Sequence, residues 1–468
     1  MANNRNTEIY ELPGDSVTAS RTMAATIASR NHPGVFELPG DPVMTTHTPI
    51  ITDFKSGISI NSDGRVNIDY NSTLTRRLSK LYTSHFSLRP TTPPPEYYDI
   101  CRDNSQSSGP PPEYPGRVSG RESYPDIKLN IVIQVVGSRG DVQPFIALGN
   151  ELQRCGHRVR LATHDIFENF VRASGLEFYP IGGEPGELMA YMVKNPGLIP
   201  SMRSLRAGEV GRKRAMIREM LDRCWRSCIE PDMATQVPFV ADAIIANPPS
   251  FAHIHCAQAL SIPVHLMFTM PWTSTKAFPY PLANLTGGGD EDQGFRNFVS
   301  YGVVNWLTWQ GVGDLINQWR KELGLDEIAM FEGPYLAEIL KIPFTYCWSP
   351  ALVPRPSEWP SHIDVCGFFF REPPQYDPPA DLQAFLASGP TPIYIGFGSI
   401  VLENPQRITD IIFNAVRAAG VRAIISKGWS HLGGTHDDNV YFIGDCPHEW
   451  LFDRVAIVVH HGGAGTTA

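Results

Sequence analysis

The fold is decided by the sequence LNIVIQVV at residues 129–136 and the sequence GSRGD that follows it at residues 137–141. The Val- and Ile-rich run predicts a buried strand, and the paired glycines predict a turn. Apolar residues then keep helical spacing over residues 142–152, and residues 158–163 form a second apolar run. Strand, glycine-rich loop, helix and strand predict a βαβ unit, whose loop lies at the carboxyl end of a strand where open α/β sheets bind ligands.

A second α/β unit is predicted near the C-terminus. Residues 391–399 indicate a strand that ends in GFGS, and a helical stripe over residues 408–420 follows it. Further strands are predicted at residues 421–426, 440–443 and 456–459. The last of them leads into HHGGAGTT at residues 460–467, where three glycines in four positions let the backbone approach a ligand closely. A helix starting there directs free N–H groups at an anion, so this segment is a candidate phosphate site.

Two questions concern the loop at residues 137–141: whether it binds a dinucleotide, and which role Asp141 has. Its glycines do not fit G-x-G-x-x-G, which excludes a dinucleotide fingerprint at this site. Asp141 lies beside a predicted helix N-terminus, where an acidic residue is either a cap or a chemically active group.

The composition separates a tail from a folded body. The 468 residues are 42% hydrophobic, and the formal net charge of −9 argues against nucleic acid as a partner of the whole chain. All nine Trp lie after residue 125, and the stretch before them is rich in Pro and lacks a sustained period, which predicts a disordered tail over residues 1–125. The tail repeats Pro-Pro-x-Tyr at Pro94–Tyr97 and Pro111–Tyr114, a pattern that binds WW domains through a polyproline II helix. We expect either bivalent binding to a WW-domain ubiquitin ligase or a solvated linker.

The two glycine-rich loops carry a family resemblance. GSRGDVQP at residues 137–144 resembles the opening of sterol 3-beta-glucosyltransferases and related glycosyltransferase family 28-type N-terminal domains. PHEWLF at residues 447–452, followed by HHGGAGTT, resembles the nucleotide-sugar signature of the same enzymes. The resemblance implies an α/β GT-B fold, in which two Rossmann-like doubly wound domains face a cleft. It divides the chain into a tail at 1–125, an acceptor domain at 126–372, a linker at 373–390 and a UDP-sugar domain at 391–468.

The resemblance also implies a reaction. Glucose passes from UDP-glucose to the 3-beta-hydroxyl of a membrane sterol with inversion, Asp141 removes the hydroxyl proton, and neither a metal nor a cofactor takes part. The donor-binding residues implied are Ser138, Arg139, His164, Ser399, Trp450, His461, Gly463, Gly465 and Thr466. The aromatic residues expected near the acceptor are Trp272, Trp306 and Trp309. Asp290-Glu291-Asp292 imitates the Asp-x-Asp metal motif of GT-A enzymes, but it follows three glycines with no strand before it and is interpreted as an acidic loop.

Two expectations concern the ends and the location of the chain. The family pattern continues beyond Ala468 with an Asp-Gln pair that contacts the sugar, so we expect the second domain to be truncated here. No apolar signal core and no run of ~20 apolar residues is present, which predicts a cytoplasmic protein that is not secreted and has no transmembrane segment. The sterol acceptor predicts peripheral membrane association, and the basic segment at residues 203–226 is interpreted either as a surface that docks on anionic lipid or as a solvated helix face. Alternative functions are transfer to another lipid or polyketide acceptor, and a catalytically impaired homologue that acts as a WW-binding scaffold.

Overall fold

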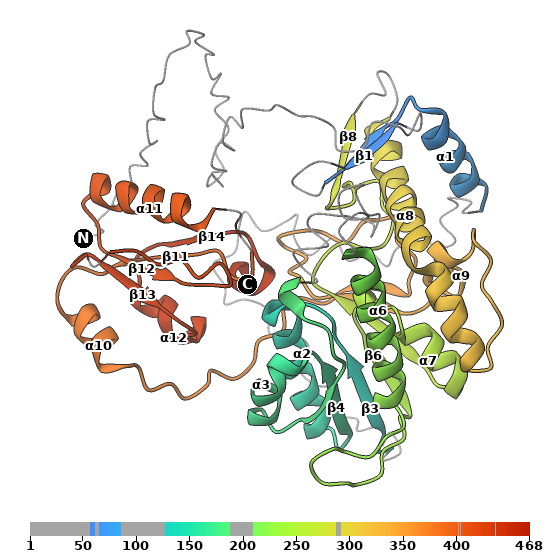
Figure 1. The fold of residues 1–468 in the computed structure, drawn as a ribbon, viewed down its shortest axis with the longest axis horizontal. Helices are drawn as coiled ribbons and strands as arrows, with labels where there is room; N and C mark the ends of the chain where they lie inside the picture. The colour runs from blue at the N-terminus through green and yellow to red at the C-terminus, as the bar shows by residue number, and fades with distance from the viewer. Residues whose placement is uncertain are drawn as a thin grey trace, which may run out of the picture.

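The computed structural model describes residues 57–60, 65–85, 127–187, 209–286, 292–400, 402, 404–435 and 437–468. Both Pro-Pro-x-Tyr motifs lie outside the described residues. The described part of the chain forms three sheets (Figure 1). We call the largest sheet with its helices the N-terminal body, and the last sheet with its helices the C-terminal body.

The N-terminal body is built on a seven-stranded parallel sheet in the order β10-β9-β7-β6-β3-β4-β5. Its strands are β3 (Asn130–Gln134), β4 (Arg158–Thr163), β5 (Glu177–Pro180), β6 (Ala243–Ala246), β7 (Val264–Phe268), β9 (Phe344–Tyr346) and β10 (Ile363–Val365). Its main helices are α2 (Arg139–Arg154), α3 (Glu168–Ala173), α6 (Glu209–Ser227), α7 (His253–Leu260), α8 (Gln293–Glu322) and α9 (Leu336–Ile339).

Helices cover both faces of this sheet, which explains why consecutive residues of β3, Ile131 to Ile133, are all apolar. Val132 belongs to the core on one face, with residues of α6 and α8, whereas Ile131 and Ile133 belong to the core under α2 and α3 on the other. Successive side chains of a strand point to opposite faces, so a central parallel strand needs apolar residues at every position. The βαβ unit predicted from residues 129–163 is confirmed by β3, α2 and β4.

A small sheet joins the N-terminal region to the middle of the chain, and it corrects one prediction. β1 (Ile58–Ile60), β2 (Val66–Asp69) and β8 (Ala283–Thr286) form it, and α1 (Thr73–His85) lies beside α8 in Figure 1. Val66, Ile68 and Tyr70 are buried in one core with residues of α8. The predicted disorder of residues 1–125 is therefore wrong for residues 57–60 and 65–85, because the partners of this short apolar alternation lie more than 200 residues further along.

The C-terminal body contains a four-stranded parallel sheet in the order β13-β12-β11-β14. The strands are β11 (Ile393–Gly396), β12 (Ala423–Ser426), β13 (Val440–Ile443) and β14 (Val458–His460). The helices are α10 (Ala380–Ala387), α11 (Pro405–Ala419), α12 (His448–Leu451) and α13 (Ala464–Thr467).

Both faces of this second sheet are covered too. α11 packs on the face that holds Ile395, and α10 and α12 pack on the face that holds Tyr394. The predicted α/β class, with two parallel Rossmann-like sheets, is confirmed. α10 falls within the predicted linker 373–390, yet it buries Leu382 in the C-terminal body, so part of that segment is structural.

Two further findings bear on the sequence-based expectations. In the described part of the chain, no helix has both the length and the apolar character that a membrane span requires. The seven cysteines among the described residues are free thiols.

Candidate functional site

The loop after β3 folds tightly around the carboxyl group of Asp141. Gly137 has a φ of +143°, and a Cβ atom there would lie 2.3 Å from Asp141 Oδ2. Asp141 Oδ2 accepts hydrogen bonds from the backbone N–H of Ser138 at 2.7 Å and from Ser138 Oγ at 3.0 Å. Ser138 is the N-cap of α2. The capping role considered for Asp141 is therefore present in the structure.

The same carboxyl group has the electrostatics of a general base. Burial raises the pKa of Asp141 above its ordinary value, and the hydrogen bonds from Ser138 oppose this shift without cancelling it. A base works best when its pKa approaches the working pH, so a raised carboxyl pKa favours proton abstraction. Both hydrogen bonds from Ser138 go to Oδ2, so capping and proton transfer can use different oxygens of one side chain.

Arg139 reaches across to the C-terminal body. Its Nη1 atom lies 3.1 Å from Asp445 Oδ2, and its guanidinium carbon lies 4.7 Å from the centre of the Phe170 ring. The side chain predicted to meet donor phosphates is therefore paired with a carboxylate of the opposite body.

A second ion pair also joins the two bodies. Arg371 Nε lies 2.9 Å from Glu449 Oε1, and the Arg371 guanidinium also lies over Phe170, at 5.5 Å. Gln143 Nε2 donates to the same Glu449 oxygen at 3.4 Å. These contacts hold the first turns of α2 against α12, so the sequence motifs at residues 137–144 and 447–452 meet at one boundary.

The glycine-rich segment after β14 lies at this boundary as well. β14 pairs with β11, so the loop that contains Ser399 and the loop that begins at His461 leave neighbouring strands. The His461 ring lies against two glycines: a Cβ atom would come within 2.7 Å of the ring at Gly398 and within 2.5 Å at Gly463. Gly463 is the N-cap of α13, which contains Gly465 and Thr466 and contacts α2. Figure 1 shows the C-terminus between the two bodies.

His461 is best suited to hydrogen bonding as a neutral imidazole. Burial lowers its pKa below the ordinary value, and the neighbouring His460 lowers it further. A lowered pKa leaves the ring uncharged at neutral pH, so its contribution at an anion site is a directed N–H rather than a full positive charge.

Trp450 and His164, two residues implied at the donor site, both make contacts within the protein. The Arg454 guanidinium covers the Trp450 ring at 4.1 Å, and Tyr376 meets that ring in a T-shaped contact with centroids 5.1 Å apart. His164 is fully buried, and both of its ring nitrogens contact backbone groups. Trp450 therefore packs within the C-terminal body, and His164 supports the fold beneath the loop.

The three tryptophans assigned to the acceptor are packing residues in this structure. Trp272 makes T-shaped contacts with Phe268 and Tyr280, and Trp306 packs against the core between α8 and the small sheet. Trp309 fits against Gly313 and Gly333, where an added Cβ atom would clash with its ring. All three are partly buried and pack against the cores of the region expected to bind the acceptor, so their predicted role at the acceptor stays a prediction.

The basic residues of α6 are largely neutralised within the fold. Lys213 pairs with Glu187, Arg214 with Asp314, and Arg218 with Glu322. On the apolar side, Met220 and Leu221 are buried in the core. The described part of the basic segment 203–226 is thus mainly a structural helix.

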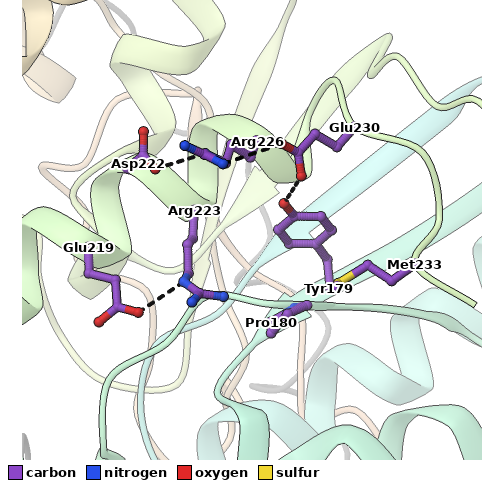
Figure 2. Close-up of a pocket in the computed structure, with 8 residues that line it drawn as sticks. All are labelled: Tyr179, Pro180, Glu219, Asp222, Arg223, Arg226, Glu230 and Met233. Atoms are coloured by element: carbon purple, nitrogen blue, oxygen red, sulfur yellow. Dashed lines mark hydrogen bonds and ion pairs between the residues drawn. The ribbon is translucent and has the colours of Figure 1, made fainter.

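Figure 2 shows a pocket of about 380 Å³ beside α6. Its charges pair with one another: Glu219 with Arg223, and Asp222 and Glu230 with Arg226. None of the residues predicted to bind donor or acceptor lines it; the lining residues are Tyr179, Pro180, Glu219, Asp222, Arg223, Arg226, Glu230 and Met233.

The acidic motif at residues 290–292 does not form a metal site in the described residues. Asp292 is the N-cap of α8 and accepts a hydrogen bond from the Gly294 N–H at 3.0 Å, while residues 290 and 291 lie outside the described part. Among the described residues, no group of three or more His, Cys, Asp or Glu side chains is placed to hold a metal ion.

Sequence reasoning missed three polar residues at the site. Asn247 follows β6 and binds the backbone of Val136, and Arg371 and Glu449 join the two bodies. Asn247 carried a usable signal, since it ends an apolar strand run at the same sheet edge as Gly137. The ion pair carried none, because its members lie far apart in the sequence.

Comparisons with known proteins agree with the motifs. Residues 131–279 match the glycosyltransferase family 28 N-terminal domain. The chain is 46% identical over 353 residues to sterol 3-beta-glucosyltransferase UGT80B1 of Arabidopsis thaliana, covering 74% of this chain and 56% of that protein. It is 38% identical over 367 residues to a sterol 3-beta-glucosyltransferase of Leptosphaeria maculans, covering 74% of this chain and 24% of that one.

The chain is therefore similar in sequence to sterol 3-beta-glucosyltransferases, in agreement with the resemblance of the motifs, and it spans about half the length of the plant relatives. Among solved structures it is similar to the Streptomyces sp. SF2575 glycosyltransferase SsfS6, with 17% identity, a TM-score of 0.42, and coverage of 72% of this chain and 78% of that one. The calicheamicin glycosyltransferase CalG4 gives 15% identity, a TM-score of 0.45, and coverage of 73% and 76%.

Proposed function

We propose that this chain carries the acceptor-activating part, and a portion of the donor site, of a sterol 3-beta-glucosyltransferase. The observation that carries the proposal is the meeting of the Asp141 loop with the glycine-rich loop after β14, at the boundary of two parallel α/β bodies. The identity to sterol 3-beta-glucosyltransferases supports the choice of reaction. UDP-glucose is the proposed donor and a sterol the proposed acceptor.

In the proposed reaction Asp141 acts on the acceptor. Its carboxylate takes the proton of the sterol 3-beta-hydroxyl as the hydroxyl oxygen attacks the anomeric carbon of glucose. The bond from that carbon to the diphosphate oxygen breaks, its electron pair leaves with UDP, and the configuration inverts. The raised pKa of Asp141 supports this role, because a stronger base takes the proton more readily.

Departure of UDP needs stabilisation of its developing negative charge. His461, the backbone N–H groups of Gly463 and Gly465 and the hydroxyl of Thr466 are the proposed donors, with Ser399 approaching from the loop after β11. Fixed hydrogen-bond donors aimed at developing charge are a strong source of catalysis. We propose no metal for this step.

Membrane association is proposed on the chemistry of the acceptor alone. A sterol is dissolved in a bilayer, so an enzyme that glucosylates it works at the membrane surface. Since the cations of α6 are paired within the fold, we do not assign this contact to that helix. Recruitment of a WW-domain ubiquitin ligase stays a proposal on Pro94–Tyr97 and Pro111–Tyr114, tested by loss of WW binding in Tyr97→Ala with Tyr114→Ala.

The experiment supplies radiolabelled UDP-glucose with ergosterol or sitosterol and extracts the lipid product. We expect sterol glucoside from the wild type and none from Asp141→Asn. Parallel reactions offer a non-sterol lipid and a polyketide aglycone as alternative acceptors. Label in those products alone would change the acceptor class, and label in no product would refute the enzymatic proposal.

A further inference from the structure

Two buried polar side chains flank the residues that lead into the Asp141 loop. β3 lies between β6 and β4 in the sheet, and all three strands are parallel. Asn247 follows β6 directly and His164 follows β4 directly. Both side chains are fully buried, and each hydrogen-bonds the backbone that continues β3.

Asn247 satisfies both backbone groups of Val136. The Val136 N–H donates to Asn247 Oδ1 at 3.0 Å, and Asn247 Nδ2 donates to the Val136 carbonyl at 2.7 Å. Val136 is itself almost fully buried, so removing the amide would leave a buried donor and a buried acceptor without partners. The Asn247 side chain thus continues the hydrogen bonding between β6 and β3 beyond the ends of both strands.

His164 binds the next residue from the other side. The Gly137 N–H donates to His164 Nε2 at 3.1 Å, and His164 Nδ1 lies 2.8 Å from the Gly182 carbonyl oxygen and 3.1 Å from that of Gly183. Carbonyl oxygens only accept hydrogen bonds, so Nδ1 carries the proton and Nε2 is the acceptor. The surroundings thus select one neutral tautomer of the ring.

The conformation of the loop depends on these two contacts. Gly137 has a φ in the left-handed half of the map, and the Asp141 carboxyl group lies directly against its Cα position. We propose that Asn247 and His164 are positioning residues, which fix Val136 and Gly137 from both neighbouring strands and thereby set the place of the Asp141 carboxylate. The role in catalysis rests on the proposed function, whereas the role in loop geometry does not.

The first test compares substitutions at two fully buried side-chain amides, those of Asn247 and Gln134. Asn247→Leu removes both contacts to Val136, and Gln134→Met is the matched control, since Gln134 is fully buried on β3 but bonds the Cys224 carbonyl instead of the loop. We expect Asn247→Leu to lower kcat by on the order of 10²-fold with little change in KM for UDP-glucose, because misplacement of a catalytic group costs about this factor. Gln134→Met should leave kcat within a few-fold of the wild type. Equal losses of kcat in both variants would overturn the proposal.

The second test separates the two sides of His164. His164→Gln places an amide oxygen near the position of Nε2 and keeps an acceptor for Gly137, whereas His164→Asn reaches only the position of Nδ1 and keeps the bond to Gly182. We expect His164→Gln to retain most of kcat and His164→Asn to lose it. The reverse order, or equal activity of the two, would overturn the proposal. These two His164 variants also test the positioning role if Asn247→Leu does not fold.

Amide exchange gives a readout that needs no turnover. In the wild type, NMR should show slow exchange at the Val136 and Gly137 amides, with selective loss of protection at Val136 in Asn247→Leu and at Gly137 in His164→Asn. If the wild type forms no glucoside, the proposed function is refuted. The exchange rates of the Val136 and Gly137 amides then test the positioning role by themselves. Retained protection in both variants would then overturn it.

Discussion

The two glycine-rich loops of the site follow strands of the same kind but have different support. The loop at residues 137–141 leaves β3, which has β4 and β6 as neighbours, and buried side chains from both sides hold its start. The loop that begins at His461 leaves β14, which is the edge strand of its sheet in the described part of the chain. His461 and Gly462 are exposed.

This difference shows how position in a sheet determines preorganisation. A loop after an interior strand is surrounded by the ends of two other strands, and their side chains can fix its backbone. A loop after an edge strand has such neighbours on one side only, so the first loop should tolerate change less than the second. The following predictions test this contrast, from the largest expected effect to the smallest.

Gly137→Ala should have the largest effect on stability. The added Cβ atom would lie 2.3 Å from the Asp141 carboxylate in a backbone conformation with φ of +143°, at a cost of about 1–3 kcal/mol in stability. Activity should fall by on the order of 10²-fold because the carboxylate is displaced. Chemical denaturation and the glucoside assay measure the two effects.

Gly463→Ala is the matched substitution in the second loop. Its Cβ atom would come within 2.5 Å of the His461 ring, but Gly463 has a φ of −60°, which alanine adopts without backbone strain. We expect a smaller loss of stability than for Gly137→Ala. Equal losses in the two variants would remove the contrast between the loops.

Asp141→Asn should separate capping from catalysis. The amide oxygen of Asn can still accept the hydrogen bond from Ser138, so stability should change by less than about 1 kcal/mol. Loss of the base should lower kcat by roughly 10²–10⁴-fold. A variant with normal turnover would show that Asp141 only caps α2.

Ser138→Ala should shift the pH dependence of turnover. The Ser138 hydroxyl lowers the pKa of Asp141 against the larger effect of burial, so its removal should raise that pKa further. A general base works in its deprotonated form, so the acidic limb of the rate profile should move to higher pH. Ser399→Ala should leave this limb in place, and a limb that moves to lower pH in Ser138→Ala would contradict the assignment.

The ion pairs between the bodies should give the smallest effects. The Asp445 side chain is 96% exposed, so Asp445→Asn should change stability by less than about 0.5 kcal/mol, and high salt should abolish the difference. Glu449→Gln should cost more, because Arg371 and Glu449 are 13% and 26% exposed and Gln143 joins them. Urea titrations at low and high salt measure both, and a larger effect for Asp445→Asn would reverse the assignment.

Local sequence patterns predicted the elements that local patterns can specify. β3, α2 and β4, and later β11, α11 and β13, each contain their own periodicity, and the glycine-rich loops carry their own turn signals. Asp141 and Ser138 could be identified from the sequence because both lie in the glycine-rich turn at residues 137–141, which follows the first predicted strand.

Contacts between distant residues were not predictable in this way. β2 is a short alternation that becomes a strand only beside β8, and α10 was assigned to a linker because its few apolar residues gave no strong period. Two contacts of residues implied at the donor site were also missed: the His164 ring hydrogen-bonds buried backbone groups, and Arg454 covers the Trp450 ring. Neither partner is visible from spacing along the chain.

The pairing of β2 with β8 has a consequence for synthesis on the ribosome. Val66 pairs with Ala283, so β2 emerges more than 200 residues before its partner strand is made. At roughly 5–20 residues per second, this delay is on the order of 10–40 s. During that time Ile68 and Tyr70 have no core to enter, so the nascent chain must be kept from aggregating until α8 and β8 arrive. Formation of the small sheet is therefore expected to wait for synthesis of β8, the partner strand made more than 200 residues after β2.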